Sequence, residues 1–201
     1  MTNHARFRAF IAAFSALVDA AAADEERIFR EGAPLLSALV GHDDWLPEEF
    51  ACSEPGAYRQ YLLYCDPRER FSVVSFVWGP GVKTPIHDHT VWGMVGVMRG
   101  AENCYEYDAP VPDVALKPKA EHRCAPGDVD KVSPTVGDIH VVENALADRP
   151  SVSIHVYGAN IGAVKRHVFD PATGAAKPFV SGYSSAVLPN FWDRSREQAP
   201  G

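Results

Sequence analysis

The sequence predicts a mainly β domain, a barrel or a sandwich, preceded by helices. Short runs rich in β-branched and aromatic residues follow one another from residue 58 to residue 169, separated by Gly, Pro and Asp, as is typical of such folds. Before residue 54 the apolar residues recur instead at the three- and four-residue spacing of amphipathic helices. With 201 residues and 46% apolar content, the chain is expected to form a single domain around one core.

Two helices and a short third one are expected in residues 1–54. The first follows Arg6 and includes an Ala-rich run, which superficially imitates a secretory signal. Its larger apolar residues share one helical face, so we interpret it as a helix that packs on the outside of the β domain; they are Phe7, Phe10, Ile11, Phe14, Leu17 and Val18. Residues 24–40 form the second expected helix and residues 46–52 the third, where Pro47 suits the first turn. The chain has no apolar run of about 18 residues, so no membrane span is expected.

The β region is expected to supply eight strands, followed by a C-terminal extension. The expected strands cover residues 58–65, 71–78, 91–98, 103–107, 129–132, 139–142, 152–157 and 166–169. Residues 1–54 then form a helical segment, residues 55–181 the β-barrel and residues 182–201 an extension rich in Ser, Pro and charge. The end of this extension is expected to be exposed, with Phe191 and Trp192 available to pack on the barrel.

Charge and cysteine content favour a cytoplasmic protein that acts on small molecules. The formal net charge is −7 and the isoelectric point is about 5.6, which argues against nucleic acid or an anionic membrane as the main partner. The four cysteines lie far apart without a Cys-x-x-Cys spacing, so they resemble neither a zinc knuckle nor a redox pair; they are Cys52, Cys65, Cys104 and Cys124. We expect a reduced, cytoplasmic chain that is a monomer or a small homo-oligomer.

Three histidines form the strongest candidate site. His87 and His89 are one residue apart, and alternate side chains of an extended backbone point to the same face, so both imidazoles converge. His140 follows a Gly-Asp turn and begins another apolar run, which places a third imidazole near a strand start. Asp88 points to the opposite face and is interpreted as an outer or structural carboxylate. The pattern predicts one metal site, and imidazole suits iron, zinc, copper or nickel.

These segments resemble the two signature motifs of the cupin superfamily, whose jelly-roll barrel, or double-stranded β-helix, holds a metal in its mouth. The matching residues are Gly81, His87, His89 and Gly100 in the first motif and Gly137, His140 and Asn144 in the second. Pro134 stands one residue early in the second motif, and Gly93 replaces the glutamate that usually supplies an anionic ligand. The resemblance implies a cupin barrel with two to three N-terminal α-helices packed on the outside.

A cupin that lacks this glutamate and keeps three neutral histidines resembles the thiol dioxygenases of the cysteine dioxygenase family. The resemblance implies that His87, His89 and His140 bind one Fe(2+), at which a small thiol and O2 react to give a sulfinic acid. Three neutral ligands leave the ferrous ion its full double positive charge, which favours an incoming anionic thiolate. The thiol supplies the electrons, so the resemblance implies no further organic cosubstrate.

A strictly alternating run ends at Tyr157. Ser153, His155 and Tyr157 share one face of this expected strand, and valine and isoleucine side chains occupy the other. From the spacing alone two interpretations stay open, a hydrogen-bonded relay inside the protein or a polar side that faces solvent. In thiol dioxygenases a Ser-x-His-x-Tyr run forms a hydrogen-bond network whose tyrosine reaches the metal site. The resemblance therefore implies a catalytic role for Ser153, His155 and Tyr157.

Several positions depart from the animal cysteine dioxygenases and resemble the bacterial branch that acts on 3-mercaptopropionate. Gly93 replaces the cysteine that crosslinks to the relay tyrosine, so no thioether can form at Tyr157. Gln60 stands where an arginine binds the substrate carboxylate. We expect Arg166, which follows the relay strand, to bind that carboxylate, because a guanidinium fork is the side chain best suited to it. The expected substrate is a small thiol acid, 3-mercaptopropionate or L-cysteine.

Alternatives stay open at this point. The rivals of Arg166 are Arg59, Arg68, Arg70 and Arg99, any of which could also be an ordinary surface residue. The remaining histidines are interpreted as core or surface residues without a ligand role; they are His4, His42, His122 and His167. A cupin scaffold can also carry a metal-dependent isomerase or hydrolase, or a non-catalytic small-molecule-binding site, because a fold does not fix a function.

Overall fold

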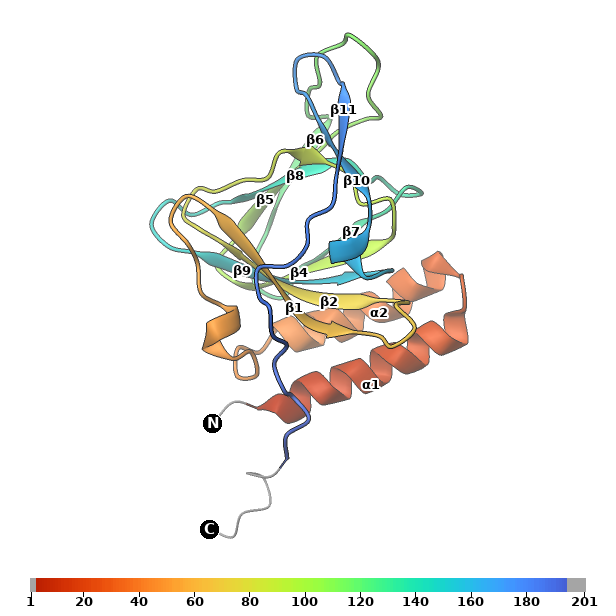
Figure 1. The fold of residues 1–201 in the computed structure, drawn as a ribbon, viewed down its shortest axis with the longest axis vertical. Coiled ribbons are helices and arrows are strands. Elements are labelled where there is room, and N and C mark those ends of the chain that lie inside the picture. Colours follow the sequence, from red (N-terminus) through yellow and green to blue (C-terminus); the bar gives the residue numbers. More distant parts are fainter. Residues whose placement is uncertain (1–2, 195–201) are drawn as a thin grey trace.

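The computed structural model describes residues 3–194, and its centre is a pair of antiparallel sheets that face each other (Figure 1). The five-stranded sheet has the order β1-β2-β9-β4-β7, and the six-stranded sheet the order β11-β10-β3-β8-β5-β6. The first sheet consists of β1 (Tyr58–Cys65), β2 (Ser72–Trp78), β9 (Ser151–Tyr157), β4 (Gly93–Arg99) and β7 (Val129–Val132). The second consists of β11 (Ala176–Phe179), β10 (Arg166–Phe169), β3 (Ile86–His87), β8 (His140–Asn144), β5 (Glu102–Glu106) and β6 (Ala120–Cys124).

Two helices cover the outer face of the five-stranded sheet (Figure 1). The larger apolar residues of α1 (His4–Ala21) and α2 (Glu25–Val40) share one core with side chains of β2, β4 and β9. Asp24 caps α2 by accepting a hydrogen bond of 2.9 Å from the backbone N–H of Arg27. This arrangement confirms the predicted fold class, a cupin barrel with N-terminal helices on its outside. The expected third helix is shorter than predicted, because only a 3₁₀ turn, η1 (Glu48–Phe50), forms there.

Both faces of the central strands are buried, one under the helices and the other between the two sheets. Every residue of β2 and of β9 is buried. On β9, Val152, Ile154 and Val156 face the helices and belong to the core shared with them. The alternate residues must then face the space between the two sheets, because successive side chains of a strand point to opposite faces. The polar side of β9 is therefore an interior surface, and the solvent-facing interpretation is excluded.

All eight predicted strands form, with ends shifted by at most two residues, and three further strands were not predicted. β3 has only two residues, too few for an alternating pattern to show. β6 is the outermost strand of its sheet, and its residues are largely exposed or half-buried. β11 contains Pro178 and lies at the opposite edge of the same sheet, where proline is tolerated. A second 3₁₀ turn, η2 (Ile161–Ala163), links β9 to β10.

The C-terminal segment returns to the helical layer. Phe191 is fully buried, with its ring centre 4.2 Å from that of Phe7 on α1. Trp192 is half exposed and lies 5.8 Å, between ring centres, from Tyr64 on β1. Both residues thus pack back on the domain, although Phe191 contacts the helices rather than the barrel. The end of the predicted extension, residues 195–201, lies outside the described residues.

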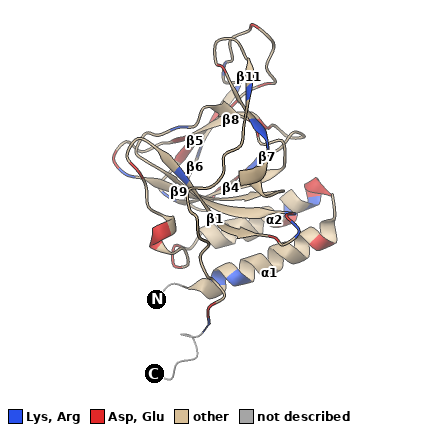
Figure 2. Ribbon diagram, in the orientation of Figure 1, with Lys and Arg blue, Asp and Glu red and all other residues tan. Residues whose placement is uncertain are grey.

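Charged side chains are spread over the helices, the strand ends and the loops (Figure 2). Several of these side chains form surface ion pairs, such as Arg6 with Asp44 at 2.8 Å. Within residues 3–194, the helices fall short of the length and apolar character that crossing a membrane would require.

Candidate metal centre

Three histidine side chains meet inside the barrel. His87 ends β3 and His140 begins β8, and the two residues are paired directly across the antiparallel ladder. His89 lies two residues further, in the connection from β3 to β4. The ring centres are 4.8 to 4.9 Å apart, and one nitrogen of each ring lies within 4.8 Å of the others. All three side chains are buried. The structure therefore brings together the three histidines that the sequence assigns to one site.

Each of these imidazoles has its Nδ1 atom engaged by another group. The partners are the carbonyl oxygen of Pro85 at 3.1 Å from His87, Oδ1 of Asp138 at 3.1 Å from His89 and Sγ of Cys104 at 3.5 Å from His140. Such contacts fix the orientation of a ligand ring and leave Nε2 as the free nitrogen. Three Nε2 atoms are thus available at one point.

Burial holds His87 and His140 in the neutral form that metal binding requires. Burial, followed by the neighbouring His89, lowers the pKa of His87 to about 3. The same causes hold the pKa of His140 well below its usual value. These two neutral imidazoles, with the buried ring of His89 beside them, fit a metal ion, because an imidazole binds through its unprotonated nitrogen. Three imidazole nitrogens suit iron, zinc, copper or nickel, and they do not distinguish among these ions.

Two aspartates support the triad from outside. Asp138 accepts hydrogen bonds of 2.9 Å from the backbone N–H groups of His89 and Thr90, so it holds the loop as well as the ring of His89. Asp88 instead contacts His167 on β10, accepting from its backbone N–H at 2.6 Å and lying 2.8 Å from its Nδ1 atom. Asp88 therefore joins two neighbouring strands, as the structural interpretation of this residue expects. The role of Asp138 was not predicted from the sequence, although this residue is part of the Gly-Asp turn that precedes His140.

The relay residues form a continuous hydrogen-bonded line in the barrel interior. Ser153 Oγ lies 2.8 Å from His155 Nε2, and His155 Nδ1 lies 2.8 Å from the Tyr157 hydroxyl. The indole N–H of Trp78 donates to Ser153 Oγ at 3.1 Å. An indole can only donate, which favours Ser153 donating to His155, His155 donating to Tyr157, and the phenol proton pointing into the cavity. Burial lowers the pKa of His155 and raises that of Tyr157, so both side chains stay neutral.

A buried carboxyl group lies next to the serine end of this line. Glu102 on β5 is 2% exposed, and neither of its carboxyl oxygens has a hydrogen-bond partner among the described residues. Burial raises its pKa to about 8, and the neighbouring side chains of Ser153, Ser151 and Trp78 offset only part of that effect. Glu102 is therefore largely protonated at pH 7, which the sequence did not suggest.

Gly93 leaves space for the ring of Tyr157, the relay tyrosine. It pairs with Tyr157 in the β4–β9 ladder, and a Cβ atom at this position would lie 2.7 Å from Cδ1 of the phenol ring. On its other side the ring of Tyr157 stacks on His89, with 5.5 Å between ring centres. With the ring in this position, a side chain at residue 93 would have to displace the phenol of Tyr157.

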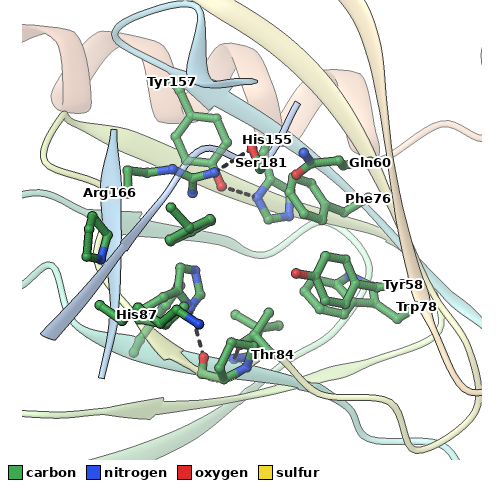
Figure 3. A pocket seen from close by; sticks show the side chains of 17 residues that line it. Tyr58, Gln60, Phe76, Trp78, Thr84, His87, His155, Tyr157, Arg166 and Ser181 are labelled. Atoms are coloured by element: carbon green, nitrogen blue, oxygen red, sulfur yellow. Dashed lines mark hydrogen bonds between the residues drawn. The ribbon is translucent and has the colours of Figure 1, made fainter. Parts of the chain in front are cut away.

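A cavity of about 240 Å³ connects His87 and His140 of the triad, His155 and Tyr157 of the relay, and β10 (Figure 3). Its wall is formed by Tyr58, Gln60, Phe76, Trp78, Thr84, Pro85, His87, His140, Val142, His155, Tyr157, Arg166, Val168, Lys177, Pro178, Phe179 and Ser181. Aromatic and aliphatic side chains predominate, with a few polar groups between them, as is usual for a small-molecule site. Tyr157, His87 and Arg166 point into this same space from three different strands (Figure 3).

Arg166 is a buried cation without an acidic partner. It is 4% exposed, its Nη2 donates to Ser181 Oγ at 2.7 Å, and its guanidinium lies 4.8 Å from the ring centre of Phe179. Nε has no hydrogen-bond partner, and no carboxylate within residues 3–194 forms an ion pair with this side chain. A buried charge is costly unless an opposite charge compensates it. The guanidinium is therefore prepared for an anion inside the cavity.

The other arginines that were candidates for binding the substrate carboxylate form ion pairs outside the cavity. The pairs are Arg59 with Glu54, Arg68 with Asp19, Arg70 with Asp19 and the buried Asp66, and Arg99 with Asp43 and Glu48. None of these four side chains lines the cavity. Gln60 does line it, and its side-chain amide donates to the carbonyl oxygen of Gly182, which holds the C-terminal segment against β1.

Sequence reasoning missed several residues of the cavity. Ser181 and Phe179 hold Arg166, and Tyr58, Phe76 and Trp78 form an aromatic wall. Residues 179–181 lie at the end of β11, a strand that the sequence did not predict. The aromatic residues were assigned to strands, but the sequence could not show which face of each strand lines the interior.

Comparisons with known proteins give the following similarities. The family model described as "Cysteine dioxygenase type I" matches residues 41–170. A cysteine dioxygenase type 1 from Danio rerio is 24% identical over 160 residues, which are 78% of this chain and 73% of that protein. A Klebsiella pneumoniae structure with a double-stranded β-helix domain is 14% identical, has a TM-score of 0.45, and aligns over 68% of this chain and 97% of its own. A cupin superfamily structure from Desulfitobacterium hafniense is 12% identical, with a TM-score of 0.43 over 59% and 94% of the two chains.

Proposed function

We propose a thiol dioxygenase function for this chain, because it belongs to the cysteine dioxygenase type I family. The proposed reaction converts one small thiol acid and one O2 into one sulfinic acid. Both oxygen atoms end on sulfur, and the sulfur supplies the electrons, so the balance requires no further reductant. The proposed substrate is 3-mercaptopropionate, with L-cysteine as the nearest competitor.

His87, His89 and His140 are the proposed ligands of one Fe(2+). Their three free Nε2 atoms and the lowered pKa values of His87 and His140 support this assignment. When bound, Fe(2+) supplies the redox-active centre at which the thiol sulfur and O2 can meet, and three neutral ligands leave its charge available for a thiolate. The position where other cupins place an anionic ligand is Gly93, which has no side chain to compete for the metal.

The observation that carries the substrate assignment is the unpaired guanidinium of Arg166 in the same cavity as the triad. A thiol acid bound through its sulfur leaves its carboxylate a few bonds away, where a buried Arg can pair with it. Ser181 and Phe179 hold the guanidinium in place before the substrate arrives. Preorganisation of this kind lowers the cost of binding.

The wall of the cavity favours a thiol acid without an amine. Of the described residues that line it, none is Asp or Glu, whereas Arg166 and Lys177 are both basic. An ammonium group would have to give up its hydration without gaining a carboxylate partner. The carboxylate of 3-mercaptopropionate meets the positive charge, and its methylene groups meet the aromatic wall. L-cysteine would carry an additional, unmatched positive charge.

Tyr157 is the proposed hydrogen-bond donor to the reacting atoms. Its hydroxyl lines the cavity, and the line from Trp78 through Ser153 and His155 favours a phenol proton that points away from His155. A donor fixed in this way can stabilise negative charge as it develops on oxygen during the reaction.

Oxygen uptake with a panel of thiols tests the proposed function. Protein loaded with Fe(2+) under anaerobic conditions is mixed with air-saturated buffer containing 3-mercaptopropionate, L-cysteine or cysteamine. We expect one O2 consumed per sulfinate formed, and the highest kcat/KM for 3-mercaptopropionate. Sulfinate must be identified by mass, since metal-catalysed thiol oxidation yields disulfide instead. Loaded protein that forms only disulfide would overturn the proposal. A reducing, cytoplasmic setting is also proposed, because it keeps both the thiol and Fe(2+) reduced.

A further inference from the structure

A second group of metal-ligating side chains lies outside the histidine triad. Cys104 on β5, His122 on β6 and Asp130 on β7 each offer a ligand atom, and these atoms lie within 4.8 Å of one another. Cys104 is buried, and the other two side chains are 37% and 25% exposed. β6 and β7 are the end strands of the two different sheets. The cluster therefore lies where one side of the barrel closes.

The histidine of this cluster is oriented as a metal ligand usually is. Its Nε2 atom lies 3.0 Å from Oδ2 of Asp130, on the side of the cluster. Its Nδ1 atom lies 3.6 Å from Oε1 of Glu106, on the other side. A carboxylate behind the second ring nitrogen is the common outer partner of a metal-bound histidine. The ring of His122 thus presents Nε2 to the cluster and has a carboxylate behind it.

We propose that Cys104, His122 and Asp130 bind one Zn²⁺ ion as a second metal site, which is independent of the proposed dioxygenase function. Sulfur, imidazole nitrogen and carboxylate oxygen are the donors that Zn²⁺ takes in proteins, and three of them leave a fourth, tetrahedral position for water. A cavity of about 60 Å³ borders Cys104 and Asp130, so there is open space beside two of the three ligands. On binding, the thiol proton is released to solvent, because the ligand is the thiolate.

Two consequences follow from the position of this site. The ion joins β5 and β6 of one sheet to β7 of the other, so it acts as a crosslink between the sheet edges. It also lies beside the triad, because Cys104 Sγ is 3.5 Å from His140 Nδ1. His122 was expected from the sequence to have no ligand role. Its neighbours Cys104 and Asp130 lie 18 and 8 residues away in sequence, so no local motif links the three.

Cobalt binding distinguishes this site from the triad, because only a thiolate ligand gives a sulfur-to-Co²⁺ charge-transfer band in the near ultraviolet. The starting protein is the full chain with Cys52→Ser and Cys65→Ser, stripped of metal and titrated with Co²⁺. We expect the band to appear, and to disappear in Cys104→Ser. Cys124→Ser is the matched control, since it removes a neighbouring thiol on β6 and should leave the band unchanged. Zn²⁺ content should fall from two ions per chain to one in Cys104→Ser.

The outcome of this test does not depend on the proposed function. In His87→Ala, which damages only the triad, the charge-transfer band should persist and the Zn²⁺ content should be one ion per chain. Absence of the band both in the starting protein and in the full chain with all four cysteines overturns the second site. A band that survives Cys104→Ser overturns the ligand assignment. Failure of oxygen uptake together with a persistent band would remove the proposed function and leave the second site in place.

Discussion

Gly93 faces Tyr157 across the β4–β9 ladder, so closely that a single Cβ atom would come within 2.7 Å of the phenol ring. The relay tyrosine therefore owes its position between the triad and His155 to the absence of a side chain on the neighbouring strand. This relationship also explains why a crosslink at Tyr157 cannot form here, since residue 93 has no sulfur to offer.

Gly93→Ala should lower turnover without removing the metal. The new methyl group has to displace the ring of Tyr157, and overpacking of this kind typically costs about 1–3 kcal/mol of stability. Gly96→Ala is the matched control, because its Cβ would meet Leu36 of α2 at 3.0 Å on the helical side of the same strand. We expect a similar loss of stability for both variants, and a loss of kcat beyond that of the control only for Gly93→Ala. Equal kcat values would show that the position of Tyr157 tolerates the change.

Replacing any one histidine of the triad by Ala should abolish iron retention and activity together. Two imidazoles without a carboxylate form too weak a site to survive gel filtration after anaerobic loading. His42→Ala is the control, since His42 is exposed and lies outside the cavity. Iron content by elemental analysis is the measurement. A His140→Ala protein that keeps both its iron and its activity would contradict the ligand assignment.

Most of the fold could be predicted because its signals are local. The alternation along residues 151–157 identified a strand, and the spacing of Phe7, Phe10 and Phe14 identified a helix. β3, β6 and β11 escaped prediction because they are very short or lie at a sheet edge, where pairing with a neighbour rather than apolar periodicity makes the strand. Their existence depends on tertiary contacts.

Site residues that belong to a short sequence motif could also be predicted. Residues that only support or complete the site could not. The spacing of His87 and His89 identifies them as a candidate ligand pair. The alternation along the strand identifies the relay residues Ser153, His155 and Tyr157. Whether the relay faces solvent or the interior depends on the helices that cover the opposite face of β9, which no local pattern reveals. The unpaired state of Arg166 is likewise a property of the folded cavity.

Tyr157→Phe should lower kcat by on the order of 10² while leaving iron content unchanged, because it deletes one donor directed at developing charge. KM for the thiol should change little, since the donor acts mainly in the transition state. Tyr105→Phe serves as control, because the Tyr105 hydroxyl donates to Glu143 and does not line the cavity. A Tyr157→Phe enzyme that matches the parent rate across pH would remove the tyrosine from the mechanism.

Glu102→Gln should make the fold less sensitive to pH. Burial raises the pKa of Glu102 from 4.5 to about 8, so between these pH values the folded chain keeps a proton that the unfolded chain has lost. Unfolding then releases a proton, and stability falls as pH rises through this window by on the order of several kcal/mol. Gln remains neutral and lacks this slope. Urea unfolding at pH 5 and pH 8.5 should show a smaller difference for Glu102→Gln than for the parent.

The control for this measurement is Glu121→Gln, which changes an exposed carboxylate on the neighbouring strand β6. It should retain the pH dependence of the parent protein. A Glu102→Gln variant whose stability falls between pH 5 and 8.5 as steeply as that of the parent would mean that Glu102 is ionised in the folded chain at neutral pH.

Arg166→Gln should raise KM for 3-mercaptopropionate and spare thiols that have no carboxylate. A hydrogen bond between charged groups contributes about 1.5–3 kcal/mol, and about 1.4 kcal/mol corresponds to a factor of ten, so we expect an increase on the order of 10- to 100-fold. Cysteamine has no carboxylate to lose its partner, and its KM should stay near the parent value. For Arg166→Lys we expect a KM between those of the parent and Arg166→Gln, because lysine keeps the charge but not the planar fork.

Arg68→Gln, which changes an arginine paired with Asp19 at the surface, is the matched control and should leave both KM values unchanged. If Arg166→Gln impairs both thiols equally, the residue acts through folding or metal geometry, since a carboxylate anchor can affect only the anionic substrate.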